Sequence, residues 1–194
     1  PEVYPLLSNQ NILVMQFVEG QSIESLASLA QSIRDSVASH LLALFFQELF
    51  CFKLMQTDAN FANYQYQVET DNLLLLDFGA TRVIPNALSK NYQRLMSASI
   101  HNDRAMMADA AQAIGFFQEA ISEQQQSLVL DIFYLACEPL RYDGEYDFSN
   151  NTLASRVKAA GMAMSMQKNQ WHSPPADAIF VHRKLAGLYL LASR

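Results

Sequence analysis

The sequence contains only two cysteines in 194 residues, so a disulfide framework cannot organise the fold. Cys51 and Cys137 each fall within an apolar helical pattern, and we predict that both are reduced core residues. No uncharged apolar run reaches the roughly 18 residues that a membrane-spanning helix needs, and no signal peptide is visible. The chain begins at Pro1 and soon enters an apolar run, as a fragment or a processed product would.

Charged side chains are also scarce, at 16% of the residues, whereas about 25% is usual for a soluble domain. Two interpretations stay open. Some apolar surface meets a partner, another lobe or a lipid, or a long helical core simply uses few charges. The length suits one domain or one large lobe.

The charges that are present are unevenly placed. Residues 1–80 hold nine acidic and two basic side chains, a net charge of −7, and the remaining residues carry +1, which gives the overall −6. Nucleic-acid binding needs lysine and arginine at the phosphates, so the acidic half predicts no nucleic-acid partner. It suits metal cations or a basic partner, although a solvated acidic face would have the same composition.

The first 85 residues alternate between short apolar runs and helical patterns. Residues 12–15 form a β-branched run that predicts a buried strand. Apolar residues at helical spacing predict helices over residues 22–33 and 36–55. Residues 64–68 and 73–76 predict the two strands of a hairpin, because turn-forming residues join them.

The rest of the chain predicts helices only, near residues 86–100, 103–114, 119–138, 150–167 and 176–193. Asn102 is an expected N-cap, and Ser122 with Gln125 fits a capping box. Gly115 and Pro139 are expected to end helices, and a Pro-Pro pair at 174–175 to open the last one.

Three polar motifs follow one another in a fixed order along the chain. Residues 15–20 read Met-Gln-Phe-Val-Glu-Gly at the end of the first predicted strand. Asp58 and Asn63 lie five residues apart after the long helix, and Asp77 follows Asn63 by fourteen residues, across the hairpin, in Asp-Phe-Gly. Each motif alone is weak, but the order and spacing are those of the protein-kinase catalytic loop and metal-binding aspartate.

Phosphoryl transfer explains these residue types, because it depends on positioning and on neutralising phosphate charge with Mg²⁺. Asn63 and Asp77 are the candidate ligands, since Mg²⁺ takes oxygen ligands and usually only one or two from the protein. Asp58 would act as a base or would orient the attacking hydroxyl or water. The backbone of Gln16, Phe17 and Val18 would meet an adenine edge, and Met15 would lie behind it as an apolar residue.

The motifs also depart from those of ordinary protein kinases. Gln56-Thr57 stands where His-Arg usually precedes the catalytic aspartate, so an activation-loop phosphate would lose its arginine partner. No Ala-Pro-Glu sequence follows Asp77, so the usual platform for a protein substrate is missing.

With these variations, the chain resembles the AarF/UbiB family of atypical protein-kinase-like ATPases. The resemblance rests on residues 14–20, 48–50, 56–58, 75–82 and 183–189 together with Asn63, and it extends over nearly the whole chain. It implies a mainly α (α+β) fold, a kinase-like C-terminal lobe with a small hairpin and additional C-terminal helices. It also implies Mg²⁺ and ATP as cofactors, Asp58 as the catalytic-loop aspartate, Asn63 and Asp77 as metal ligands, and a link to ubiquinone biosynthesis.

The resemblance divides the chain into a hinge strand at 1–20, a catalytic segment at 21–85 and a helical subdomain at 86–194. Ala59 replaces the family's proline after the catalytic aspartate. The N-terminal lobe, with its nucleotide-covering loop and strand lysine, is expected to be absent. No lysine of this sequence is expected to take the role of the strand lysine, because Lys53 lies in the long helix. The chain alone should therefore bind nucleotide poorly and turn over little.

Two functions of different classes follow. The first is a Mg-ATP-dependent phosphotransferase or ATPase that needs an N-terminal lobe. The second is a non-catalytic helical module that binds a partner or a lipid on a kinase-like scaffold. Nucleotide is the expected partner. Two further possibilities stay open: binding to a lipid, a quinone precursor or a membrane surface, and a homodimer. The expected location is cytoplasmic or peripheral to a membrane.

Two further sets of side chains remain ambiguous. His40, His101, His172 and His182 have no metal-ligand spacing and are expected on the surface or on helix faces. Glu48 lies on an apolar helix, where it would either pair with a base such as Arg82 or Arg183 to brace the catalytic loop, or face solvent.

Overall fold

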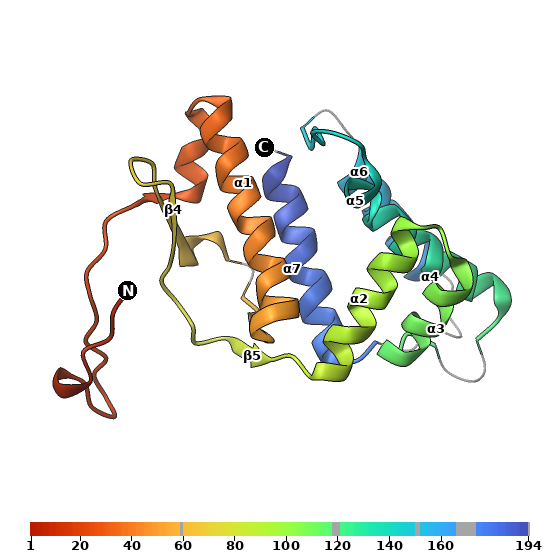
Figure 1. Cartoon of the computed structure of the whole chain (residues 1–194), viewed down its shortest axis with the longest axis horizontal. Helices are drawn as coiled ribbons and strands as arrows, with labels where there is room; N and C mark the ends of the chain where they lie inside the picture. The colour runs from red at the N-terminus through yellow and green to blue at the C-terminus, as the bar shows by residue number, and fades with distance from the viewer. Residues whose placement is uncertain (59, 118–120, 150–151, 166–173, 194) are drawn as a thin grey trace.

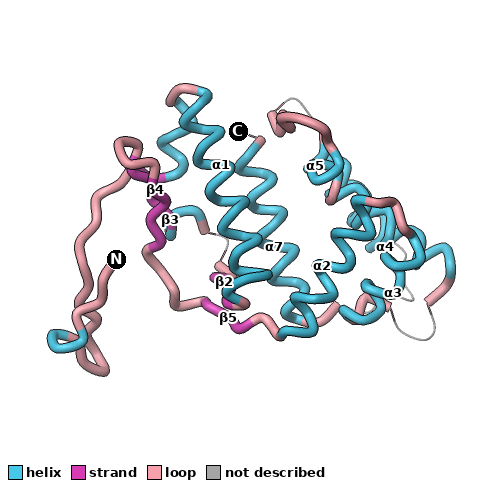
Figure 2. Tube along the Cα trace, in the orientation of Figure 1, coloured by secondary structure: helices cyan, strands magenta, loops and turns pink. Residues whose placement is uncertain are grey.

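A computed structural model describes the chain except for residues 59, 118–120, 150–151, 166–173 and 194 (Figure 1). Helices dominate it, and strands are few and short (Figure 2). Helix α1 (Gln31–Phe46) lies beside α7 (Ala176–Ala192) near the middle of the molecule. The mainly α fold with a small β-hairpin that the sequence predicts is confirmed.

The other helices form a second group on one side of this pair. Helix α2 (Asn86–Ile100) packs on α3 (Arg104–Ile114), and α4 (Glu123–Ala136) packs on α6 (Leu153–Ser165), with the short α5 (Glu138–Arg141) between them in the chain. One apolar core runs through both groups, so they fold as a unit.

Two small antiparallel sheets lie on the other side of α1. Strand β3 (Tyr64–Gln67) pairs with β4 (Asn72–Leu75) as the predicted hairpin, and β1 (Gln21–Ser22) adds to the free edge of β3. Strand β2 (Leu54–Gln56) pairs with β5 (Thr81–Val83), which the sequence does not predict.

The local signals at the helix ends are mostly confirmed. Ser122 and Gln125 form the expected capping box at the start of α4. Gly115 ends α3 with φ of +102°, a left-handed conformation that glycine adopts without steric cost. Asn102 is not the N-cap of α3, however, because Asp103 accepts the capping hydrogen bond from the backbone of Met106 at 3.0 Å.

The boundary between the first two predicted helices is wrong. A 3₁₀ helix at Ile23–Ser28 precedes α1, and the chain is extended at Leu29 and Ala30 rather than near residue 35. No glycine or proline interrupts residues 31–46, so α1 runs through that point.

The predicted burial of Cys51 is also wrong, whereas Cys137 is buried as expected and neither thiol is in a disulfide. Helix α1 continues as a π-helical segment, Gln47–Phe52, that buries Glu48 and Leu49. A π-helix winds more residues per turn than an α-helix, so it rotates the following positions away from the face that an α-helical pattern predicts. Cys51 therefore lies on the exposed side.

Residues 12–15 are not a buried strand. The chain folds back on itself near its N-terminus, with a bridge between Val3 and Met15 and a short 3₁₀ helix at Pro5–Leu7. This arm leaves the body in Figure 1, and Leu6 and Phe17 are 99% and 83% exposed. An apolar strand is buried only where another layer covers it, and the described residues place none there.

His182, on α7, is enclosed by aromatic rings rather than placed on an open surface. Its imidazole stacks on Phe116 at 5.2 Å between centroids and meets Phe133 and Tyr92 edge-on. The Tyr92 hydroxyl lies 3.0 Å from Nε2. Burial lowers the pKa of His182 from 6.5 to about 4, because the charged form loses its water.

This depressed pKa predicts acid sensitivity. Neutral His182 stabilises the folded state fully above the unfolded pKa of 6.5, and that contribution is lost as pH falls towards the folded pKa of about 4. Since each pKa unit corresponds to about 1.4 kcal/mol, we expect roughly 2–3 kcal/mol for this partly exposed residue. Urea unfolding at pH 7 and pH 4 measures it.

The matched variants are His182→Gln and His101→Gln, the second at an exposed position at the end of α2. His182→Gln should lose less stability between pH 7 and pH 4 than the parent chain, and His101→Gln should follow the parent. Equal losses in the parent chain and His182→Gln would contradict the assignment.

Candidate functional site

Asp58 lies in the loop that follows β2, and local hydrogen bonds hold it. Its Oδ2 accepts a hydrogen bond from the side-chain amide of Asn63 at 3.0 Å, and its Oδ1 accepts one from the backbone of Asn60 at 3.3 Å. Asn60 in turn caps a 3₁₀ turn, Phe61–Asn63, by accepting from the backbone of Ala62. The loop thus brings Asp58 and Asn63 into direct contact.

The β3–β4 hairpin brings Asn63 beside the strand end that carries Asp77. Tyr64 is opposite Leu75 in the register, and the backbone N–H of Leu76 donates to the Asn63 carbonyl at 3.0 Å. Asn63 and Asp77 therefore leave the hairpin at the same end, the end opposite its turn.

The β2–β5 pair brings the other side of the Asp-Phe-Gly motif next to Asp58. Gln56 is opposite Thr81, and both the backbone N–H and the hydroxyl of Thr57 donate to the Ala80 carbonyl, at 3.0 and 2.6 Å. Thr57 precedes Asp58, and Ala80 follows Gly79 of the motif. Two strand pairs therefore gather three polar residues that are up to 19 positions apart in sequence.

The oxygen donors of this cluster suit a divalent cation. Asp77 is exposed, and its Oδ1 accepts from the backbone of Gly79 at 2.7 Å, which leaves Oδ2 for a ligand. The Asn63 amide nitrogen is engaged with Asp58, so its amide oxygen is the atom left to coordinate. The described residues contain no group of three or more His, Cys, Asp or Glu that could hold a metal, but Mg²⁺ at phosphates needs only one or two protein ligands.

Met15–Val18 is not brought to this cluster. Glu19 and Gly20 lie on the hairpin, where the Gln67 amide donates to the Glu19 carbonyl and a Cβ at position 20 would approach Gln65 Cβ and Leu74 Cδ1 to 3.0 Å. The chain then runs from this contact into the exposed arm, and the backbone N–H of Gln16 donates to Glu2.

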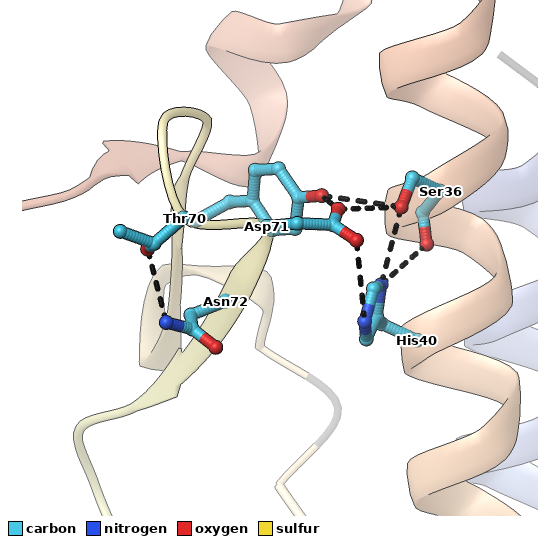
Figure 3. A network of polar contacts seen from close by, with 6 residues as sticks. Ser36, His40, Thr70, Asp71 and Asn72 are labelled. Carbon is cyan, nitrogen blue, oxygen red and sulfur yellow. Dashed lines mark hydrogen bonds and ion pairs between the residues drawn. The ribbon is translucent and has the colours of Figure 1, made fainter.

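The turn of the hairpin is tied to α1 by a polar network (Figure 3). Asp71, with φ of +55°, accepts hydrogen bonds from Ser36 at 2.6 Å and from the Tyr66 hydroxyl, and His40 Nε2 lies 4.0 Å from its second oxygen. These two hydrogen bonds lower the pKa of Asp71. The network fixes the end of the hairpin that is remote from Asn63.

A cavity of about 120 Å³ lies elsewhere, among the 3₁₀ helix at Ile23–Ser28, α1 and the end of α7. Its lining includes Leu26, Val37 and Leu191 but no residue of the loop at 56–63 or of the motif at 77–80. The metal-ligand candidates Asn63 and Asp77 thus lie at the end of the β3–β4 hairpin rather than inside this cavity.

The comparisons with known proteins agree on one family for this chain. The ABC1 atypical kinase-like domain family matches residues 1–111. The chain is 29% identical over 196 residues to the Saccharomyces cerevisiae protein "Atypical kinase COQ8, mitochondrial" and 31% identical over 198 residues to the Rattus norvegicus "Atypical kinase COQ8B, mitochondrial". This chain belongs to the AarF/UbiB family of atypical kinase-like proteins.

The family match reaches beyond the site but not over whole relatives. A Dictyostelium discoideum protein named "Probable serine/threonine-protein kinase abkA" is 29% identical over 203 residues, and all three alignments cover 100% of this chain. The chain spans 39%, 36% and 36% of the yeast, rat and Dictyostelium relatives. Among the described residues of this family member, no helix is long and apolar enough to cross a membrane.

Next to Gln56, two residues before Asp58, this AarF/UbiB chain buries an ion pair whose partners the sequence patterns do not predict. Lys184 of α7 donates to Glu48 Oε2 and, at 2.9 Å, to the backbone carbonyl of Gln56. Glu48 is 5% and Lys184 3% exposed. Of the two interpretations of Glu48, pairing is therefore correct and solvent exposure wrong, but the partner is neither Arg82 nor Arg183.

Arg82 pairs instead with Asp177 at the start of α7, at 2.7 Å, and lies over the Phe180 ring. The sequence signal that could have identified Lys184 is its place between Val181 and Leu188 on the buried face of α7. Lysine is seldom fully buried without a partner, so a lysine at that position predicts a buried acid.

Burial governs the charges in this region. It raises the pKa of Glu48 and lowers the pKa of Lys184, and the attraction between the two groups opposes both changes. Burial, with the negative charges of Glu48 and Asp58, also raises the pKa of Tyr64, whose hydroxyl donates to the Gln56 side chain at 3.1 Å.

Proposed function

We propose that this chain forms the metal- and phosphate-binding part of a Mg-ATP-dependent atypical kinase or ATPase. The observation that carries the proposal is that Asn63 donates to Asp58 while the β2–β5 and β3–β4 pairs bring the chain at Asp77 to the same strand ends, which supplies the carboxylate and amide oxygens that phosphoryl transfer with Mg²⁺ uses. Asn63 and Asp77 would hold Mg²⁺, which would neutralise the phosphate charge.

Asp58 takes the role of a base or an orienting group for the attacking hydroxyl or water. The hydrogen bonds from Asn60 and Asn63 fix its carboxylate, so it needs no reorganisation before it accepts a hydrogen bond from the nucleophile. No Ala-Pro-Glu sequence, which would form the platform for a protein substrate, follows Asp77. A small molecule or water therefore suits the site better as the phosphate acceptor than a folded protein.

A complete nucleotide site also needs contacts to adenine and a strand lysine, and neither comes from Asp58, Asn63 or Asp77. Met15–Val18 would offer backbone groups to adenine only after the arm meets another layer, because it is exposed here. This chain spans 39% and 36% of the yeast and rat relatives, and we propose that an N-terminal lobe supplies that layer. Little turnover is expected from these 194 residues alone.

The family relationship supports a role in ubiquinone biosynthesis. Two of the relatives are named as mitochondrial proteins, and a peripheral attachment to a membrane surface would bring the site close to a lipid or quinone precursor. A non-catalytic partner- or lipid-binding module is the second candidate. The exposed apolar side chains of the arm favour it, since Leu6, Leu13 and Phe17 are each more than half exposed.

A thermal-shift titration tests the metal site. ADP with Mg²⁺ should raise the melting temperature, and Asp77→Asn should abolish the part that depends on Mg²⁺, because an amide replaces the anionic ligand. A ligand at 100 times its Kd stabilises the native state by about 2.7 kcal/mol, which is about 5–10 °C for a domain of this size.

Asp143→Asn is the matched control, since Asp143 is exposed in the loop after α5 and changes the net charge equally. It should behave as the parent chain. A Mg²⁺-dependent shift that survives in Asp77→Asn would remove Asp77 from the metal site. No shift in the chain, followed by none in a chimaera in which it replaces the matching segment of the yeast relative, would favour the non-catalytic module.

A further inference from the structure

We propose that α7 positions the catalytic segment through two polar ties, so that Lys184 and Glu48 are positioning residues of the metal site. The inference rests on the proposed function for its effect on ligand binding. The family match at residues 1–111 does not include α7, yet Lys184 lies 136 residues from Glu48 in sequence and meets it in the interior.

The first tie holds β2 two residues before Asp58. Glu48 Oε1 accepts from the backbone N–H of Gln56 at 3.4 Å, and Lys184 donates to the backbone carbonyl of the same residue at 2.9 Å. The ion pair therefore grips both backbone groups of Gln56. Thr57 follows, with its own two hydrogen bonds to Ala80. The ion pair therefore fixes the end of β2 from which Asp58 extends.

The second tie holds the partner strand. Arg82 of β5 donates from both Nε and Nη2 to Asp177 Oδ1, at 3.1 and 2.7 Å, and its guanidinium lies 4.9 Å from the centre of the Phe180 ring. Asp177 and Phe180 lie in the first turns of α7. The helix thus contacts both strands of the β2–β5 pair, one leading into Asp58 and the other following Asp77.

Stability alone does not account for a buried ion pair at this place. Two opposite charges in an interior each lose their hydration, and an apolar pair of similar volume is often as stable. What the apolar pair cannot do is bond the Gln56 carbonyl and N–H. The Gln56 side chain, whose Nε2 has no partner among the described residues, adds no second grip on α7.

The test uses the double variant Glu48→Leu/Lys184→Met, which keeps volume and removes both charges. Amide hydrogen exchange of the 194-residue chain, followed by mass spectrometry, reports on residues 54–64 directly. We expect exchange there at least ten times faster than in the parent chain, with no change in α2 and α3 at 86–114. The Kd for Mg-ADP should rise at least tenfold, and more than the Kd for ADP without Mg²⁺.

Arg183→Met is the control, because Arg183 is exposed on the same helix next to Lys184. It should leave exchange and both Kd values unchanged. Unchanged exchange at 54–64 in the folded double variant, or equal acceleration at 86–114, would overturn the positioning role. If neither the parent chain nor a chimaera in which it replaces the matching segment of the yeast relative binds Mg-ADP, the proposed function fails, and the exchange comparison still decides whether α7 holds the loop.

Discussion

Replacing Lys184 alone by methionine should destabilise the chain by about 3–5 kcal/mol, because Glu48 is then left buried without its counter-charge. The pair is among the most deeply buried polar groups in the described residues, with both side chains at most 7% exposed. Chemical unfolding at pH 7 measures the loss directly. It should exceed the cost of the double variant, because there neither charge remains.

The pH dependence of the single variants distinguishes a buried ion pair from simple packing. In Lys184→Met, burial keeps the pKa of Glu48 raised in the folded chain. Neutral Glu48 therefore contributes its full stability below the pKa of the unfolded chain, and that stability is lost as pH rises through the pKa of the folded chain. The destabilisation should shrink at pH 5 and grow at pH 8.

The complementary variant Glu48→Leu should have the opposite slope. Lys184 then keeps a lowered pKa, so the fold gains stability as pH rises through the folded value towards the unfolded value of 10.5. Parallel pH profiles for the two single variants would contradict a pair that is charged in the folded chain. The control Arg183→Met should follow the parent chain at every pH.

Sequence patterns predict this fold well where the signal is local. The hairpin at Tyr64–Leu75 and the helices from 86 onward follow from periodicity, turn residues and caps, each of which acts within a few positions. The spacing of Asn63 and Asp77 also predicts that they flank one hairpin, because a short hairpin leaves little choice of register.

The remaining features depend on distant segments and have weak local signals. Strands β2 and β5 are three residues each, too short for a period, and exist because each is the other's partner. The N-terminal arm has a strand-like composition, but no described segment lies over it, so composition predicted its burial wrongly. Lys184 and Glu48 meet only in the folded chain, and their positions on two apolar helix faces give the single hint.

Asp58→Asn should lower turnover by about 100-fold or more while it leaves Mg-nucleotide affinity within about threefold, because a positioned general base contributes roughly 10²–10⁴ in rate. Asparagine keeps an oxygen that can accept from Asn60 or Asn63, so the loop should stay folded. The measurement is ATP hydrolysis by the chimaera in which this chain replaces the matching segment of the yeast relative.

Two comparisons make that result interpretable. Asp143→Asn, equal in charge and remote in sequence from the loop, should hydrolyse ATP at the parental rate. Asp77→Asn should lose affinity for Mg-nucleotide as well as rate, since Asp77 would hold the metal and Asp58 the nucleophile. If Asp58→Asn instead loses metal-dependent affinity and Asp77→Asn loses rate alone, the two carboxylates exchange roles. Parental turnover in Asp58→Asn would remove Asp58 from the chemistry and leave it as the residue that fixes Asn63.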